Sequence, residues 1–310
     1  MIRIATLAAG ALALGFSTSA IASDDQDVRQ LKSKDAPDLA SGKAYFFYDT
    51  LESKYDIYFL RSMTERELDR YTANRETALA EARDKLRSKR DGAPGVSDEQ
   101  LLPDVGFDFI DDSIRNLARM DSGRVYEKDG NRRTYAVEVP PGEYTIFAAG
   151  IDGFIGGTCM CMGTVRFDAK AGEAVDLGAI LVAPENGKTD IAELAPYEAP
   201  EYIRRKALPF KMSVRLPQAG DAVPALLGDM QVSPAVYSAA TDHIPNFMGM
   251  LINRMAPIDG VLAYDEDRVI DVRSASSSAS SEGMKPVGEE PREGAEDAGD
   301  TVETNANGEG

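Results

Sequence analysis

One histidine, two cysteines and no tryptophan occur among the 310 residues of this chain. A single histidine excludes sites that need two or more, such as the HExxH zinc motif or a three-histidine cage. The 34 Lys and Arg residues face 52 Asp and Glu residues, which gives a net charge of −18. Nucleic-acid binders need a basic surface that displaces the counterions of phosphate groups, so this balance argues against nucleic-acid binding.

The signatures of common catalytic sites are also missing. The sequence has no G-x-S-x-G nucleophile elbow and no recognisable pairing of a nucleophile with a base. Its one histidine, His243, lies in Thr241-Asp242-His243-Ile244-Pro245, where we expect a loop histidine hydrogen-bonded near Asp242. The sequence therefore leaves enzymatic activity open and favours a protein without it.

Residues 1–22 have the pattern of a secretory signal peptide. Arg3 supplies the positive charge, Ile4 to Phe16 are apolar, and Ala20-Ile21-Ala22 is a cleavage site before Ser23. The apolar run is too short to cross about 30 Å of hydrocarbon, and no later segment reaches roughly 20 continuous apolar residues. We therefore expect a soluble protein in the periplasm or outside the cell, with no membrane span after cleavage.

The rest of the chain divides by composition into a folded part and polar ends. Residues 23–43 are polar and predict a flexible N-terminus. Residues 44–182 predict a β-sandwich domain, and residues 183–273, with many prolines near their start, predict a C-terminal extension packed on it. Residues 274–310 carry nine acidic and two basic residues and few apolar ones, which predicts a disordered acidic tail.

Short β-prone runs separated by Gly- and Pro-rich turns fill most of the domain, a pattern typical of a sandwich rather than a parallel sheet. The aromatic runs 44–48 and 55–60 predict a first strand pair. Further strands are expected over residues 123–126, 133–139, 143–149, 164–167 and 174–182. In the extension we expect a short helix within 246–255 and a hairpin of 261–264 with 269–272.

A long charged helix is expected to interrupt the sandwich at residues 64–90. Thr64-Glu65-Arg66-Glu67 is a capping box, in which Thr64 and Glu67 each satisfy a free amide of the first turn. The residues that recur behind it at steps of three and four are Leu68, Tyr71, Arg75, Ala78, Ala82 and Leu86. Such a narrow stripe buries little apolar surface. The helix is therefore expected either to lie across a sheet or to project and bind a partner protein of the envelope.

Three segments carry a resemblance to a known family. They are Val139-Pro140-Pro141-Gly142-Glu143-Tyr144-Thr145-Ile146, Val165-Arg166-Phe167-Asp168-Ala169-Lys170-Ala171-Gly172-Glu173 and Asp176-Leu177-Gly178. About residues 130–185 resemble the carboxypeptidase-regulatory-like, or transthyretin-like, β-sandwich modules of exported bacterial proteins. The whole chain, with Gly157-Thr158-Cys159-Met160-Cys161-Met162-Gly163, also resembles exported proteins of alphaproteobacteria. The resemblance implies a non-enzymatic accessory or binding module and transfers no catalytic residue.

The sulfur-rich segment Cys159-Met160-Cys161-Met162 is the feature with the most specific chemistry. A Cys159–Cys161 disulfide would suit an oxidising compartment, and a ring this small is typical of easily reduced, redox-active bridges. The two thiolates and two thioethers are also soft donors of the kind that select Cu(I). In a strand, however, the Cys and Met side chains would point to opposite faces. Disulfide, buried thiols and copper ligands all remain open.

Acidic clusters are the last candidates. A cation site or a paired-carboxylate site is one interpretation of Asp108, Asp111 and Asp112, which supply oxygen donors. A Ca²⁺ site is one interpretation of Asp265-Glu266-Asp267, but this segment lacks the alternating spacing and the central Gly of an EF-hand loop. On so acidic a chain we interpret both clusters as solvated turns.

Together these observations predict a mainly β protein: an antiparallel β-sandwich with a long inserted charged α-helix and a proline-rich C-terminal extension. The function we expect is that of an exported, soluble, non-enzymatic protein of the bacterial envelope with a binding or structural role. The alternative is a periplasmic copper or thiol-redox protein that acts through Cys159 and Cys161. No cofactor other than copper is indicated.

Overall fold

The computed structural model describes residues 28–35, 42–51, 53–89, 97–104, 107, 109, 111, 113–114, 116–151, 157–184, 188–198, 210–244 and 251–275. The chain divides into two units, Met1–Arg273 and Ser274–Gly310, and every element below belongs to the first. The predicted signal peptide lies outside the described residues, as does the predicted tail beyond Ala275.

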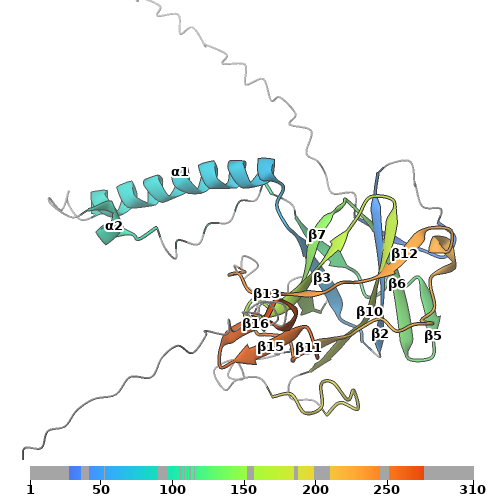
Figure 1. Ribbon diagram of the computed structural model, residues 1–310. Helices are drawn as coiled ribbons and strands as arrows, with labels where there is room; N and C mark the ends of the chain where they lie inside the picture. Colours follow the sequence, from blue (N-terminus) through green and yellow to red (C-terminus); the bar gives the residue numbers. More distant parts are fainter. Residues whose placement is uncertain are drawn as a thin grey trace, which may run out of the picture. The chain divides into compact units, whose positions relative to one another are not determined.

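Two seven-stranded sheets form the first unit (Figure 1). Sheet A has the order β1-β6-β2-β10-β11, with β5 added to β6 and β12 added to β10. Its strands are β1 (Arg29–Leu31), β2 (Ala44–Leu51), β5 (Glu127–Asp129), β6 (Arg132–Val139), β10 (Glu173–Pro184), β11 (Phe210–Arg215) and β12 (Gln231–Pro234).

Sheet B has the order β13-β9-β7-β3-β4, and β8 joins β7 to β14. Its strands are β3 (Asp56–Arg61), β4 (Leu117–Met120), β7 (Gly142–Gly150), β8 (Thr158–Cys159), β9 (Thr164–Ala169), β13 (Ser238–Ala240) and β14 (Leu251–Ile252). The predicted C-terminal hairpin is confirmed as a separate pair, β15 (Leu262–Asp265) and β16 (Arg268–Asp271). A 3₁₀ turn, η2 (Ala225–Leu227), precedes β12.

The two sheets share one apolar core. Phe46 on β2 lies 4.8 Å, ring centre to ring centre, from Phe59 on β3 and 5.6 Å from Phe167 on β9. All three rings are buried. Burial of this kind is the main stabilising contribution to folding, about 25 cal/mol for each Å² of apolar surface. The mainly β prediction is confirmed, with both sheets covering a common centre.

The prediction of an antiparallel sandwich was only partly right, because both sheets are mixed. Strand β10 runs parallel to both β2 and β12, and β14 runs parallel to β8. Each parallel pair joins segments far apart in the sequence. The turn signals used for prediction report only on neighbouring strands, so they carry no information on such pairs.

The first strand pair was also predicted incorrectly. Both aromatic runs form strands, but β2 belongs to sheet A and β3 to sheet B. The same exchange occurs four times more, because β4 and β5 lie in different sheets, as do β6 and β7, β9 and β10, and β12 and β13. At each of these points the chain crosses from one sheet to the other instead of forming a hairpin.

Parts of the two flanking segments belong to the sheets. Within the N-terminus expected to be flexible, Arg29–Leu31 pairs with β6, and Leu31 is completely buried. Within the predicted extension, strands β11 to β14 pair with sheet strands rather than only packing on them. Residues 251–252 of the predicted short helix form β14, while residues 246–250 lie outside the described residues.

The charged insertion is helical, as predicted. It comprises α1 (Glu65–Lys89) and the short α2 (Asp98–Leu101) that packs beside it. Figure 1 shows α1 starting where β3 ends, with α2 beside the other end of the helix. Among the described residues no helix has the length and apolar character needed to cross a membrane.

Candidate functional site

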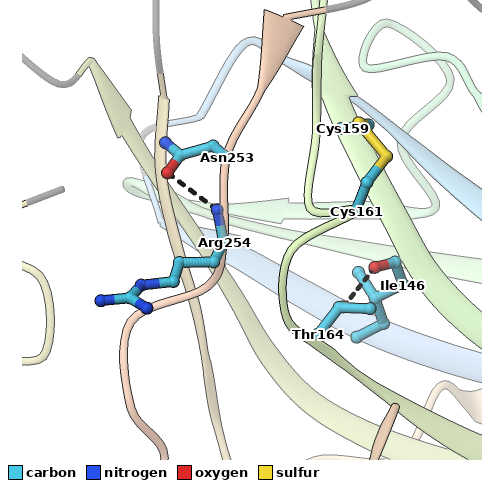
Figure 2. Close-up of a disulfide and its surroundings, with 6 residues drawn as sticks. All are labelled: Ile146, Cys159, Cys161, Thr164, Asn253 and Arg254. Atoms are coloured by element: carbon cyan, nitrogen blue, oxygen red, sulfur yellow. Dashed lines mark hydrogen bonds between the residues drawn. A yellow bond between two sulfur atoms is a disulfide. The ribbon is translucent and has the colours of Figure 1, made fainter. Parts of the chain in front are cut away.

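Cys159 and Cys161 are joined by a disulfide, so this one of the three interpretations is confirmed (Figure 2). Cys159 ends β8, and Cys161 lies in the turn that leads into β9. Their Cα atoms are 5.2 Å apart. The bridge therefore closes a ring within a single turn instead of linking distant parts of the fold.

The two sulfur atoms have different surroundings. Cys159 is fully buried among apolar side chains that include Tyr58 and Phe147, whereas Cys161 is partly exposed at the edge of that cluster. A thiolate that attacked Cys161 would release a charged sulfur at Cys159, and a charge is costly in apolar surroundings. The arrangement therefore suits a structural bridge better than a redox centre.

The methionines do not share the face of the cysteines. Met160 is completely buried in the core between the sheets, on the opposite side from the cluster around Cys159. Strand alternation produces this separation, as expected for a β conformation at this point. With both thiols bonded to each other, binding of Cu(I) by Cys159, Met160, Cys161 and Met162 stays a prediction for the reduced protein. No group of three or more His, Cys, Asp or Glu side chains in the described part of the chain is placed to hold a metal ion.

Backbone hydrogen bonds fix the disulfide turn on both sides. The Met160 amide donates to the Phe147 carbonyl at 2.7 Å, and the Asn253 amide donates to the Cys159 carbonyl at 2.8 Å. The Met162 amide completes the set by donating to the Asn253 carbonyl at 3.1 Å. The turn is thus held between β7 and the segment that follows β14.

Asn253 organises this region from inside the fold. Its side chain is fully buried, with Nδ2 donating to the Phe210 carbonyl at 2.8 Å and Oδ1 accepting from the Arg254 amide at 2.8 Å (Figure 2). Leaving a buried side-chain amide without these hydrogen bonds would lower the free energy of unfolding by about 1–3 kcal/mol. Sequence reasoning missed Asn253, because one polar residue carries no periodic signal of burial.

A second candidate site lies at the base of α1. The capping box is confirmed: the Thr64 amide donates to Glu67 Oε2 at 2.8 Å, and the Glu67 amide donates to Thr64 Oγ1 at 3.3 Å. The last residue of β3, Arg61, is buried and donates to both Glu67 oxygens, at 2.7 and 2.9 Å. Helix and sheet are therefore joined by a bidentate ion pair.

The protonation of Glu67 follows from these contacts. Partial burial by itself raises the pKa of a carboxyl group. Hydrogen bonds from Thr64 and Arg61, together with the charge of Arg61, outweigh this effect and lower the pKa of Glu67 below its ordinary value. The carboxylate stays charged, and the ion pair with Arg61 is kept down to mildly acidic pH.

Arginine side chains brace α1 against its return segment, residues 97–116. Arg75 binds the Asp104 carboxylate at 2.6 Å, and Arg83 binds Glu99 at 3.0 Å. Closer to the tip, Arg87 binds Asp98. With Tyr71 and the buried Leu79, these residues recur every four positions, so one face of the helix meets the return segment. The predicted stripe was correct in placing Tyr71 and Arg75 there, whereas Leu68 is exposed.

The opposite face of α1 is acidic as a consequence. Its exposed charged side chains are Glu65, Arg66, Asp69, Glu76, Glu81, Asp84 and Lys85. Five of these seven are acids, because Arg75, Arg83 and Arg87 turn toward the return segment. We call this exposed face, together with the braced helix that carries it, the acidic arm.

The other sequence candidates are surface features. His243 is exposed, and the neighbouring Asp242 pairs with Arg166 at 2.8 Å. Asp265-Glu266-Asp267 is the turn of the β15–β16 hairpin, where Arg254 donates to the Glu266 carbonyl at 2.8 Å. Asp111 is described, whereas Asp108 and Asp112 lie outside the described residues.

In comparisons with known proteins, no family model, no curated protein and no solved structure matches this chain.

Proposed function

We propose that this chain is an exported, non-enzymatic binding protein of the bacterial envelope that contacts its partner through the acidic arm. The observation that carries the proposal is the bracing of α1. A helix this rich in charge buries little and gains little from propensity alone. Ion pairs to the return segment and the partly buried Arg61–Glu67 pair nevertheless hold it in one orientation.

A rigid, exposed element of this kind supports a recognition role. Ordering a flexible segment on binding costs free energy, and a segment held in its bound conformation avoids that cost. The exposed charges of the arm are mainly negative, so the partner it fits is a protein with a basic surface. Contact between such surfaces is expected to weaken as salt rises.

Site-specific crosslinking tests the arm. A photo-crosslinking residue at Ala73 or Ala80, both exposed on α1, should form an adduct with one protein in intact cells. The same residue at the exposed Asp229, near η2, should not. Adducts of equal yield at all three positions, or at none, would contradict the proposal.

Charge reversal sharpens this test. Glu76→Lys with Glu81→Lys reverses the exposed charge on α1 and should abolish the adduct while leaving the melting temperature unchanged. Glu127→Lys with Asp129→Lys makes the same change in net charge on the exposed β5 and should leave the adduct intact. If the adduct on α1 persists in the Glu76→Lys, Glu81→Lys variant, the partner does not recognise the negative charge of the acidic arm.

Export is a second part of the proposal, and two observations support it. The pattern of residues 1–22 is that of a signal peptide. Disulfides such as Cys159–Cys161 persist in oxidising compartments and are rare in the cytosol. Intact mass spectrometry of protein from the periplasmic fraction should give a chain that begins at Ser23. Recovery of the full-length chain from the cytosol would overturn it.

We further propose that residues 130–185 are a transthyretin-like sandwich module. This segment supplies β6, β7, β9 and β10, and both turns that carry the resemblance connect one sheet to the other. The parallel pairing of β10 with β2 departs from an all-antiparallel module. An experimental structure tests the proposal through the strand order of this segment.

The thiol alternative rests on the partial exposure of Cys161, one of the two bridged residues. A thiol-redox or copper-binding protein would lose its activity when the cysteines are replaced, while the acidic arm would keep its partner. The crosslinking experiment on a cysteine-free variant therefore separates the two functions.

A further inference from the structure

A pocket of about 200 Å³ lies at the base of the acidic arm. One wall comes from the sheet side, with Leu60 on β3 and Thr145 on β7. The other wall comes from Tyr71 on α1 and from Phe109 and Ile114 on the return segment. Nothing in the sequence indicated this pocket, because its walls belong to four separate segments.

The walls are held in place by hydrogen bonds. Tyr71 donates its hydroxyl to the Phe109 carbonyl at 3.2 Å, and the two rings lie 5.7 Å apart, centre to centre. Asn116 is buried and donates to the Arg61 carbonyl at 2.8 Å, while the Arg61 amide donates back to the Asn116 carbonyl at 2.8 Å. The pocket is therefore preformed, as small-molecule sites usually are.

The charge that faces the pocket is negative. Of its two charged lining residues, Arg61 is engaged by both oxygens of Glu67. The other, Asp111, accepts hydrogen bonds from neutral groups: Asn74 Nδ2 at 2.7 Å and the Ser113 hydroxyl and amide at 2.6 and 2.9 Å.

Asp111 is also ionised at neutral pH. Partial burial raises its pKa, but the hydrogen bonds from Ser113 and Asn74 outweigh burial, and the positive charge of Arg70 adds to their effect. The pKa of Asp111 therefore lies below its ordinary value. Arg70 acts on Asp111 through its charge alone, because its guanidinium donates to the neighbouring Ser113 carbonyl, at 3.5 Å, and not to the carboxylate.

We propose that this pocket binds a small apolar amine, with the apolar group against Leu60, Tyr71 and Ile114 and the ammonium group on Asp111. The size is suitable, because an apolar cavity of about 150 Å³ holds benzene. A ring with a short aminoalkyl chain therefore matches this pocket. The net charge of −18 favours a cationic ligand over an anionic one at long range. This site is independent of the protein partner proposed for the arm.

Two probes of nearly equal shape test the proposal. Titrations of the full chain with 2-phenylethylamine and with its neutral analogue 2-phenylethanol, followed by NMR chemical shifts, should show the amine binding at least fivefold more tightly. Asp111→Asn should abolish that preference and leave both probes with the affinity of the alcohol. Asp229→Asn, which makes the same charge change at an exposed position, should leave the preference unchanged.

A second variant tests the apolar wall without altering charge. Ile114→Trp should fill the pocket and weaken both probes at least tenfold, and its melting temperature reports whether the fold is kept. Equal binding of amine and alcohol to the wild-type protein would overturn the assignment of an amine site. So would a preference that survives Asp111→Asn, or the absence of binding by either probe at millimolar concentration.

Discussion

Tyr144 donates its buried hydroxyl to the carbonyl oxygen of Pro140 at 2.7 Å, across the turn where the chain leaves sheet A and enters sheet B. Tyr144 lies four residues after Pro140, and this geometry is that of a tyrosine corner. Burial raises the pKa of Tyr144, so its hydroxyl stays a donor throughout the physiological pH range. The Pro-Pro-Gly-Glu-Tyr sequence thus fixes a crossing between the sheets.

Replacing Tyr144 by Phe is expected to lower the free energy of unfolding by about 1–2 kcal/mol, because the Pro140 carbonyl loses its partner. Urea unfolding followed by circular dichroism measures the change. Tyr55→Phe is the matched control, since Tyr55 is half-buried and its hydroxyl has no hydrogen-bond partner among the described residues. An equal loss in both variants would show that the corner bond contributes nothing specific.

Gly178→Ala should be among the most damaging single substitutions. Gly178 has a φ of +71°, and a Cβ there would lie 2.2 Å from the Arg215 carbonyl oxygen. We expect a loss of more than about 3 kcal/mol or failure to fold, from the clash added to backbone strain. Gly172→Ala isolates the strain, because Gly172 has a φ of +75° with nothing within 4 Å of its Cβ position. That control should lose only about 1–2 kcal/mol; similar losses in the two variants would exclude the clash.

Asp176→Asn should stabilise the protein at neutral pH. Partial burial raises the pKa of Asp176, and the nearby Asp221 and Asp49 raise it further; the Gly178 amide and the charge of Arg132 only partly offset them. The folded state therefore binds a proton more tightly than the unfolded state, so the charged form lowers stability above the folded pKa. That penalty disappears as pH falls through the folded pKa.

Urea midpoints at pH 7 and pH 3.5 test this sign for Asp176. The variant should be more stable than the wild-type protein at pH 7 and equal to it at pH 3.5. Asp229→Asn provides the control for a change in net charge at an exposed site. A variant that is less stable than the wild-type protein at pH 7 would mean that the Gly178 contact outweighs burial.

Removing the disulfide by Cys159→Ala with Cys161→Ala should lower the free energy of unfolding by only about 1.5 kcal/mol. A ring of three residues restricts the unfolded chain little, and the entropy lost on closure grows with the length of the closed loop. Thermal unfolding of the double variant, beside the wild-type protein with and without reductant, measures the cost. Loss of a partner or an activity at unchanged stability would favour the thiol-redox function.

Local features of the fold could be predicted from the sequence, and long-range ones could not. The helix start at Thr64 depends on contacts within four residues, so its capping box is visible in the sequence. The β-prone runs were also found, because side-chain type and turn residues are local. Which sheet a strand joins depends on its pairing partners. The pairing of β2 with β10 cannot be predicted from the sequence of either strand by itself.

The candidate sites show the same division. The sequence identified the Cys159–Cys161 pair because a single residue separates the two, but it left their bonding state open. Bracing of the arm was missed because it needs the pairing of Arg75 with Asp104 and of Arg83 with Glu99. On an acidic chain, a charged residue gives no indication of whether it meets solvent or a counter-ion.

The first strand of the described residues, β1, also constrains when the fold can form. Arg29 on β1 pairs with Glu138 on β6, 109 residues later in the chain, and Leu31 is completely buried only once that pairing exists. Loop closure over such a distance is slow, and sheets rich in distant pairs fold late. A nascent chain cannot complete sheet A until β6 has been synthesised, more than a hundred residues after β1, and the export proposed above would need a chain that is still incompletely folded.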